Sequence, residues 1–220
     1  MDPAGNFSDE DMIFNINIIC LAYVINMEYM FYECSSLTSI NLSNFNTSNA
    51  TNMNSIFYEC SSLISIDLSN FNSSSITTMS SKFYGFSSLT SIDLSNFSTS
   101  KIINMKYMLS GCSLLESIDL SHFINPKLIK ISYMFSRYSS LTSLDFSTFN
   151  TKKLGNIYYL FNNFTKLSDI STFHDSLNYE DAFINLNNSE IIKINKNISI
   201  IIKTIFNNNN SYDSLQIIEN

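Results

Sequence analysis

The sequence has little glycine and proline and no tryptophan: four Gly and two Pro occur in 220 residues. Tight glycine-dependent hairpin turns are therefore scarce, and the abundant Ser and Asn residues are expected to make side-chain-to-backbone turns instead. Positive charge is also sparse, because 12 Lys and Arg stand against 19 Asp and Glu, which gives a net charge of −7. Without a basic stripe to neutralise phosphates, nucleic acid is not an expected partner.

Long apolar runs and cysteine-rich stretches are missing too. The longest apolar run near the start, residues 13–25, contains two Asn and follows acidic residues rather than lysines. It is too short to span a bilayer and does not have the pattern of a signal peptide, so we expect no membrane span. Only four Cys occur, and such a small number favours buried free thiols over a disulfide framework.

A 26-residue repeat dominates what is present. The stretch "CSSLTSINLSNFN" at 34–46 returns as "CSSLISIDLSNFN" at 60–72 and as "FSSLTSIDLSNFS" at 86–98. A fixed period of this length is typical of proteins in which each unit is one coil of a solenoid. No single coil can bury its own apolar residues, whereas stacked coils bury them between neighbours.

Stacking the sequence in steps of 26 produces apolar columns. They are Leu37, Leu63, Leu89, Leu115, Leu141 and Leu167; Ile40, Ile66, Ile92, Ile118, Leu144 and Ile170; Leu42, Leu68, Leu94, Leu120 and Phe146; and Phe45, Phe71, Phe97, Phe123 and Phe149. The i, i+2 spacing of the second and third columns predicts one short, half-buried strand per coil. Because equivalent strands run in the same direction, they are expected to pair in parallel.

The other half of the unit has helical spacing. In "TNMNSIFYEC", Met53, Phe57 and Cys60 recur at three- and four-residue intervals, which predicts a helix about two turns long. Asn52 stands where an N-cap belongs. The Met column of Met27, Met53, Met79 and Met105 is interpreted as core, and so is the column of Cys34, Cys60 and Cys112, in which Phe86 and Tyr138 also occur.

The pattern Phe-x-x-Cys-x-x-Leu-x-x-Ile-x-Leu, at 31–42 and again at 57–68, resembles the BspA-like subclass of leucine-rich repeats. The resemblance covers residues 26 to about 170. It implies an α/β leucine-rich-repeat solenoid with a parallel β-sheet on the concave face and short helices or turns on the convex face. It also implies an adhesin-like role at the surface, because such repeats occur in bacterial and protist surface proteins and mycoplasma-type lipoproteins.

Four segments follow from where the repeat begins and breaks. They are an N-terminal tail and capping half coil at 1–25, the solenoid at 26–172, a shortened terminal coil at 173–196, and an Asn- and Ile-rich cap or tail at 197–220. Ile192 and Ile194 are expected to supply a last strand.

The outward positions of the expected strands define the candidate binding strip on the concave face. Its centre is Asn41, Asp67, Asp93, Asp119 and Asp145, flanked by Ser65, Ser91 and Ser117 on one side and Ser69, Ser95 and Ser121 on the other. One interpretation is a strip that binds a cation or the basic surface of a partner, with a protein or glycan as the expected ligand of the concave face. The other is that Asp keeps an exposed sheet soluble and accepts hydrogen bonds from Ser. Calcium needs six or more converging oxygens, and a flat file spreads them out, so no metal or other cofactor is expected.

Nothing in the sequence predicts an enzyme. His122 and His174 are not spaced as ligands with a Cys, Ser or carboxylate cluster, and the many Ser hydroxyls have no neighbouring base. The expected function is a non-enzymatic interaction module. The alternative is an intracellular structural scaffold, which the lack of a recognisable signal peptide and the unpaired cysteines favour.

Overall fold

The structure of the protein is a computed structural model that describes residues 24–150, 153–155, 157–171, 182–183, 192–194 and 217–219. Four strands lie in this part of the chain: β1 (Ser143–Asp145), β2 (Asp169–Ser171), β3 (Ile192–Ile194) and β4 (Ile217–Glu219). They form one parallel sheet in the order β1-β2-β3-β4. Leu144 of β1 lies opposite Ile170 of β2, one repeat further on. The strand expected at Ile192 and Ile194 is present as β3, but it is not the last strand as expected, because β4 follows it in the chain and in the sheet.

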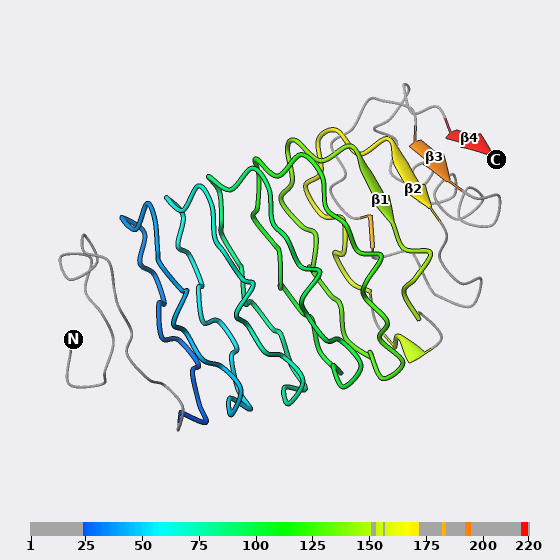
Figure 1. Ribbon diagram of the computed structural model, residues 1–220. Helices are drawn as coiled ribbons and strands as arrows, with labels where there is room; N and C mark the ends of the chain where they lie inside the picture. The colour runs from blue at the N-terminus through cyan, green and yellow to red at the C-terminus, as the bar shows by residue number, and fades with distance from the viewer. Residues whose placement is uncertain are drawn as a thin grey trace.

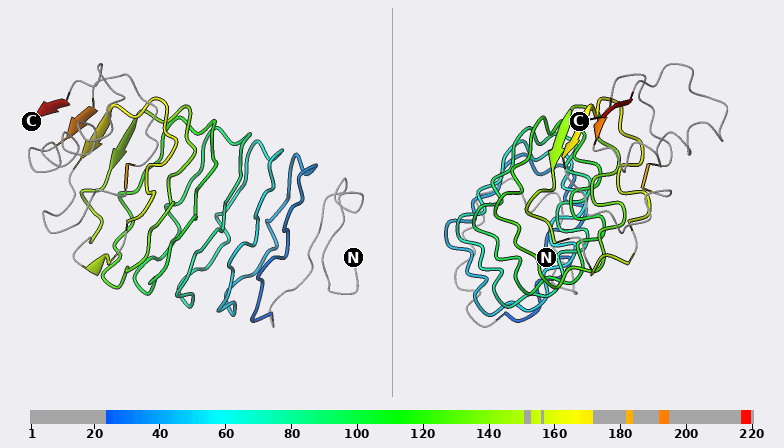
Figure 2. Two further views of the ribbon diagram at one scale, coloured as in Figure 1. Left: turned by 180° about the vertical axis from the view of Figure 1, so that it is seen from behind. Right: turned by 90° about the vertical axis from the view of Figure 1, so that its right-hand side faces the viewer.

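Successive repeats lie side by side as a row of coils, from the blue N-terminal coils to the yellow coils beside β1 (Figure 1). Viewed from one end, the coils overlie one another (Figure 2). Backbone hydrogen bonds join them at a constant offset: the Met27 N–H donates to the Asn52 carbonyl at 2.8 Å, and the Met79 N–H donates to the Asn104 carbonyl at 2.9 Å. Equivalent residues of neighbouring coils are therefore held in register.

The helix expected over residues 52–60 is not formed, and consecutive turns take its place. Ser55 and Glu59 have positive φ angles of 51° and 57°. Their N–H groups donate to the carbonyls of Ser80 and Tyr84 in the next coil, at 3.0 and 2.7 Å, rather than to carbonyls four residues back. Asn52 does accept an N–H, from Asn54 at 3.1 Å, but it closes a turn and does not cap a helix.

Strand geometry is also less frequent than one strand per coil. In the described part of the chain, the residues expected to form a strand do so at β1 and β2. The equivalent residues 65–68 of an earlier coil do not form a strand. The hydrogen bonds that join the earlier coils run instead through the stretches where a helix was expected, as from the Phe31 N–H to the Ile56 carbonyl at 2.9 Å. We call these stretches the first to sixth turn segments: 26–33, 52–59, 78–85, 104–111, 130–137 and 156–163. The coils are thus connected mainly along the side where a helix was expected.

The core is one continuous cluster that runs through the coils. The leucine and phenylalanine columns that begin at Leu37, Leu42 and Phe45 are buried, as are the Met and Cys columns, so these interpretations are confirmed. The column of Ile40, Ile66, Ile92 and Ile118 is only partly buried and packs against the edge of that core. Each fully buried side chain contributes on the order of 1.5–3 kcal/mol.

A buried polar column crosses the coils, and the sequence patterns did not identify it. Its members are Thr47, Ser73, Thr99 and Asn125, each no more than 2% exposed. The Thr47 hydroxyl accepts the Asn72 N–H at 2.7 Å and donates to the carbonyl of the same residue at 3.2 Å. Asn125 accepts the Asn150 N–H at 2.8 Å, but its buried Nδ2 finds no partner within the described structure.

Lys82 is the exception among the apolar columns, because it occupies the position of Ile56 and Met108 and is fully buried. Its Nζ lies 3.6 Å from the Met53 sulfur and 4.8 Å and 4.5 Å from the ring centres of Phe71 and Phe97. Desolvation lowers the pKa of this amine to about 7. Aromatic faces attract the charged form, but burial opposes it more strongly.

Several expectations fall on residues that the structure does not describe. They are the tail and most of the half coil at 1–25, most of the shortened coil at 173–196, which includes His174, and most of the segment at 197–220. Within the described residues, no helix has the length and apolarity needed to cross a bilayer.

Candidate interaction surfaces

The predicted strip is present as a file of exposed polar side chains, which we name the aspartate file: Asn41, Asp67, Asp93, Asp119 and Asp145. Each member accepts the backbone N–H of the serine two residues on, over 2.8–3.0 Å. This side-chain-to-backbone turn is the one that Asp and Asn favour. The file therefore shapes the coil, and its members remain exposed.

The carboxylates of the file are held in their charged form. Hydrogen bonds from the Ser69 backbone and side chain lower the pKa of Asp67, against a smaller opposing effect of the neighbouring Asp93 charge. Hydrogen bonds from the side chain and then the backbone of Ser95 and Ser121 do the same for Asp93 and Asp119. The file is accordingly a row of fixed negative charges near neutral pH.

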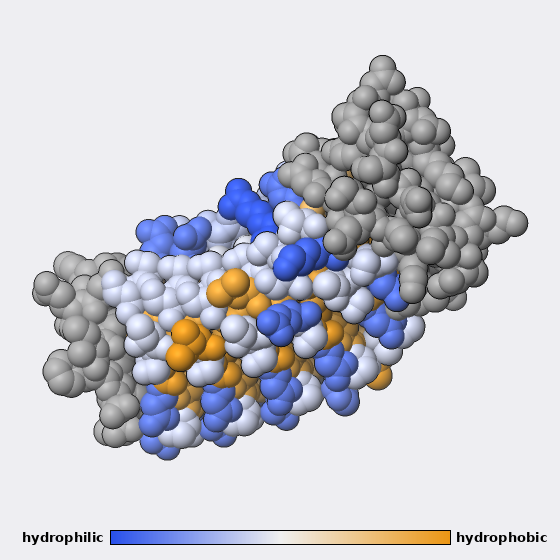
Figure 3. Space-filling model, turned by 90° about the horizontal axis from the view of Figure 1, so that it is seen from above, coloured by the Kyte–Doolittle hydropathy of each residue, from blue (hydrophilic) through white to orange (hydrophobic). Residues whose placement is uncertain are grey.

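The flanking serines are exposed, as the sequence predicted: Ser65, Ser91 and Ser117 on one side, and Ser69, Ser95 and Ser121 on the other. A view of the stack from above shows hydrophilic residues at regular intervals, with apolar side chains exposed between them (Figure 3). Among the residues near the file, Ile64 is 63% exposed and Leu114 is 47% exposed. The surface therefore combines charge, hydroxyls and isolated apolar contacts.

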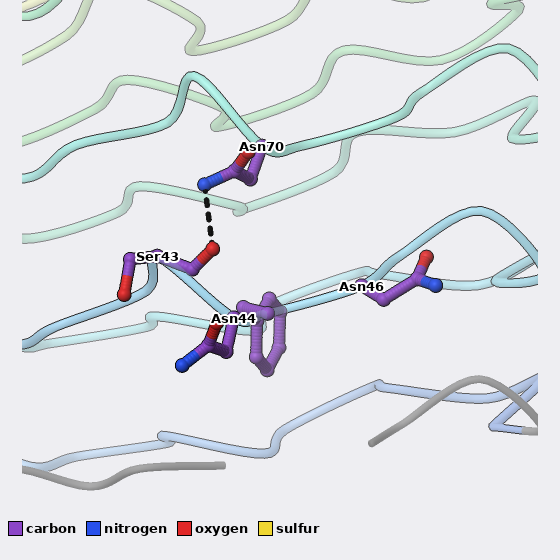
Figure 4. Close-up of a pocket in the computed structure, with 5 residues that line it drawn as sticks. Ser43, Asn44, Asn46 and Asn70 are labelled. Carbon is purple, nitrogen blue, oxygen red and sulfur yellow. Dashed lines mark hydrogen bonds between the residues drawn. The ribbon is translucent and has the colours of Figure 1, made fainter. Parts of the chain in front are cut away.

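A shallow polar hollow of about 250 Å³ lies at the N-terminal end of the file. Ser43, Asn44, Asn46 and Asn70 line it, and the Asn70 amide reaches across to donate to the Ser43 carbonyl at 2.9 Å (Figure 4). The Asn46 side chain is turned to the backbone, where it accepts the Ser48 N–H at 2.9 Å. The hollow contains no charged group and offers hydrogen-bonding groups only.

Among the described residues, no three His, Cys, Asp or Glu side chains are placed to hold a metal ion. His122 lies close enough to Asp93 and Asp119 for its charge to lower their pKa values, a proximity that the sequence analysis missed. Burial raises the pKa of the Cys112 thiol to about 12, which leaves it protonated and unreactive.

A second surface, which the sequence analysis also missed, is a row of stacked tyrosines on the turn segments. We name it the tyrosine ladder: Tyr32, Tyr58, Tyr84, Tyr107, Tyr133 and Tyr159. Within each half the rings stack, with centroids 4.5–4.8 Å apart, whereas Tyr84 and Tyr107 meet edge to face at 6.3 Å. The 26-residue spacing of Tyr32, Tyr58 and Tyr84 was the signal that could have revealed it.

The ladder lies at the surface but is not fully exposed. Tyr32 is 40% exposed, and the other five rings are half-buried. Partial burial is the main cause that raises the pKa of Tyr58 to about 12, and the neighbouring Tyr84 and Glu59 add to it. The Tyr58 phenol therefore stays neutral, and the Tyr84 hydroxyl accepts a hydrogen bond from Nη1 of Arg137 at 3.1 Å.

Charge changes sign along the turn segments that carry the ladder. The first two segments carry Glu28, Glu33 and Glu59, whereas the fourth and fifth carry Lys106, Lys130 and Arg137. Between them, the position that holds Glu59 and Arg137 is occupied by Gly85 and Gly111. The ladder face thus has an acidic half, a central part without side chains at this position, and a basic half.

Comparison with known proteins gives a family. The family model described as "Mycoplasma protein of unknown function, DUF285" matches residues 6–123 and again residues 82–199, so that the two matches together extend over most of the chain. The chain belongs to this family. No curated protein and no solved structure matches it.

Proposed function

We propose that the protein is a non-enzymatic binding module built as a BspA-like leucine-rich-repeat solenoid, and that it binds a protein partner through the aspartate file. The family to which it belongs is related to that repeat type. The row of coils joined at a constant backbone offset supports the solenoid part of the proposal. A rigid row of near-identical coils suits recognition of an extended surface.

The observation that supports the binding surface best is the state of the aspartate file. Asp67, Asp93 and Asp119 are exposed, their carboxyl pKa values are lowered, and each uses one oxygen for its own turn. These carboxylates occupy the same position of successive coils, and the Asp93 charge acts on Asp67. They form a row of negative charge that lysine and arginine side chains complement. We therefore favour a partner with a basic surface over a neutral glycan.

Asn41 makes a clean test available. It supports the same turn as the aspartates, since it accepts the Ser43 N–H at 3.0 Å. Changing Asp67, Asp93 and Asp119 to Asn should therefore remove three charges and keep the three turns. The matched control changes Glu28, Glu33 and Glu59 to Gln, which removes the same charge from the turn segments.

The experiment compares proteins captured from cell extract by the wild type, the Asp variant and the Glu variant, with mass spectrometry as readout. We expect a partner that the wild type and the Glu variant retain, that the Asp variant loses, and that elutes as salt rises. The proposal fails if every captured protein is bound equally by all three chains. Retention that resists salt and is lost after glycan removal would favour a glycan ligand instead.

A further inference from the structure

The tyrosine ladder changes its position within the turn segment at the middle of the row of coils. In the first three turn segments the ladder uses the seventh residue, as at Tyr58 and Tyr84, and in the last three it uses the fourth, as at Tyr107 and Tyr133. Two half-ladders are therefore displaced sideways from each other, and Tyr84 meets Tyr107 edge to face where they join.

In the second to fifth turn segments, serine occupies whichever of the fourth and seventh positions has no tyrosine. The fourth residue of the second and third segments is Ser55 and Ser81, and the seventh residue of the fourth and fifth is Ser110 and Ser136. Ser110 and Ser136 are buried and bonded to each other, with 2.6 Å between their hydroxyl oxygens. A low lane therefore runs beside the two inner tyrosines of each half-ladder, and Tyr29, which is 48% exposed and contacts Tyr32, closes it at the first segment.

We propose that two copies of this chain pair face to face through their tyrosine ladders, with their rows of coils antiparallel. The two-fold axis lies between the third and fourth turn segments, parallel to the backbone of those segments and perpendicular to the row of coils. Such an axis places the second segment of one copy opposite the fifth of the other, and the third opposite the fourth. Tyr58 and Tyr84 of one copy then lie over the lane at Ser136 and Ser110 of the other, and by symmetry Tyr107 and Tyr133 lie over Ser81 and Ser55.

The charges on this face are complementary under the same axis. Glu59 of one copy lies opposite Arg137 of the other, twice in each pair, whereas the remaining charged residues of the two halves lie opposite uncharged residues. Gly85 lies opposite Gly111, so the centre of the contact has no side chains at this position. The Glu59 side chain already packs over Gly85, where its Cγ is 3.2 Å from the place of an added Cβ, and this puts its carboxylate beside the central gap.

A second copy is the occupant that the ladder fits best, because the rings repeat at 4.5–4.8 Å within each half-ladder and another stack of these coils has the same interval and the same break at its middle. Tyrosine and arginine are also the residues most enriched at protein interfaces. Since the pair is closed by a two-fold axis, it stops at two chains and does not extend into a filament.

Charge exchange between Glu59 and Arg137 tests the pairing on the full chain by sedimentation velocity. We expect the wild type to pair, and Glu59→Arg alone or Arg137→Glu alone to weaken pairing by at least about tenfold through two like-charge contacts. A mixture of the two single variants should restore pairing, and so should the double variant Glu59→Arg/Arg137→Glu. Lys127→Glu, a charge reversal outside the turn segments, should pair as the wild type does.

Three results would overturn the proposal, provided that circular dichroism shows the variants folded. They are a wild type that keeps the mass of one chain at the highest concentration measured, single variants that pair as well as the wild type, and mass that rises beyond two chains. The Asp67, Asp93 and Asp119 variant should pair normally, so failure here is distinguishable from failure of the proposed partner binding.

Discussion

At Lys82 a charged residue occupies an apolar column, and the surrounding groups give it no negative partner to offset its burial. Its amine contacts a methionine sulfur and aromatic rings. The folded-state pKa of about 7 lies below the ordinary 10.5. Between these two values the unfolded chain binds more protons than the folded one, so the free energy of unfolding rises with pH across that window and is lowest below it.

We therefore predict that Lys82→Met stabilises the protein at pH 7, by on the order of 3 kcal/mol, because methionine fills this position in other coils. The wild type should gain stability from about pH 7 towards 10.5, and the variant should lack that gain. Urea denaturation at both ends of the window measures it. The exposed Lys101→Met is the control for losing one positive charge, and an identical pH dependence in the wild type and Lys82→Met would contradict the assignment.

Asn125 differs from the other members of the buried polar column because its side chain has a hydrogen-bond donor that finds no acceptor within the described structure. Where Thr47 both accepts from and donates to one residue of the next coil, Asn125 accepts the Asn150 N–H but leaves its Nδ2 unsatisfied within the described structure. Asn125→Thr should stabilise the protein by about 1 kcal/mol, since an unsatisfied buried donor is removed. The reverse change, Thr99→Asn, should cost a similar amount, and the urea midpoints of the two variants should move in opposite directions.

At the scale of the element, the turn segment differs most from expectation. Its spacing of apolar residues is helical, but some N–H groups donate to the next coil, as Phe57 does to the Lys82 carbonyl, and others close three-residue turns, as Tyr58 does to the Ser55 carbonyl. Sequence alone did not reveal this because residues such as Tyr29, Ser55 and Glu59 take positive φ, a conformation that glycine and asparagine usually signal. The hydrogen bonds offered by the next coil offset a strain that isolated residues would avoid.

Gly85 shows what that conformation costs, since it has a φ of +78° and an added Cβ would lie 3.3 Å from the Glu59 Cα. Gly85→Ala should destabilise the protein by about 1 kcal/mol, the cost of left-handed backbone for a residue with a Cβ. At Gly155 nothing lies within 4 Å of an added Cβ, so Gly155→Ala should be neutral or slightly stabilising. Equal shifts of the two urea midpoints would show that the turn conformation is not strained.

The apolar columns, in contrast, were predictable residue by residue. Leu37, Leu42 and Phe45 begin columns that are buried because every coil meets the same neighbours at the same offset. The aspartate file was identified for the same reason. Lys82, Asn125 and the shift of the tyrosine ladder escaped prediction because they break the repeat, and the outcome of each depends on three-dimensional neighbours that the period does not specify.

At the scale of the whole molecule, constant register makes the coils interchangeable. Residues 35–60 form one whole period, and deleting them joins Cys34 to Ser61, which is followed by the same Ser-Leu pair that follows Ser35. Each column then continues with one member fewer. In the tyrosine ladder, Tyr32 becomes the neighbour of Tyr84, which occupies the same position of its segment.

We therefore predict that the chain without residues 35–60 still folds and unfolds cooperatively, with a lower free energy of unfolding and a smaller dependence on urea, because one coil and its contacts are gone. Deleting only residues 87–99, in the middle of the stack, removes half as much chain but shifts the coils after the cut out of register with the coils before it, so polar residues face buried positions where the two parts meet. That variant should lose cooperative unfolding although it is longer. If the half-period deletion proved the more stable of the two in urea denaturation, the coils would not be held together by their register, because shortening the chain would then matter more than keeping its columns aligned.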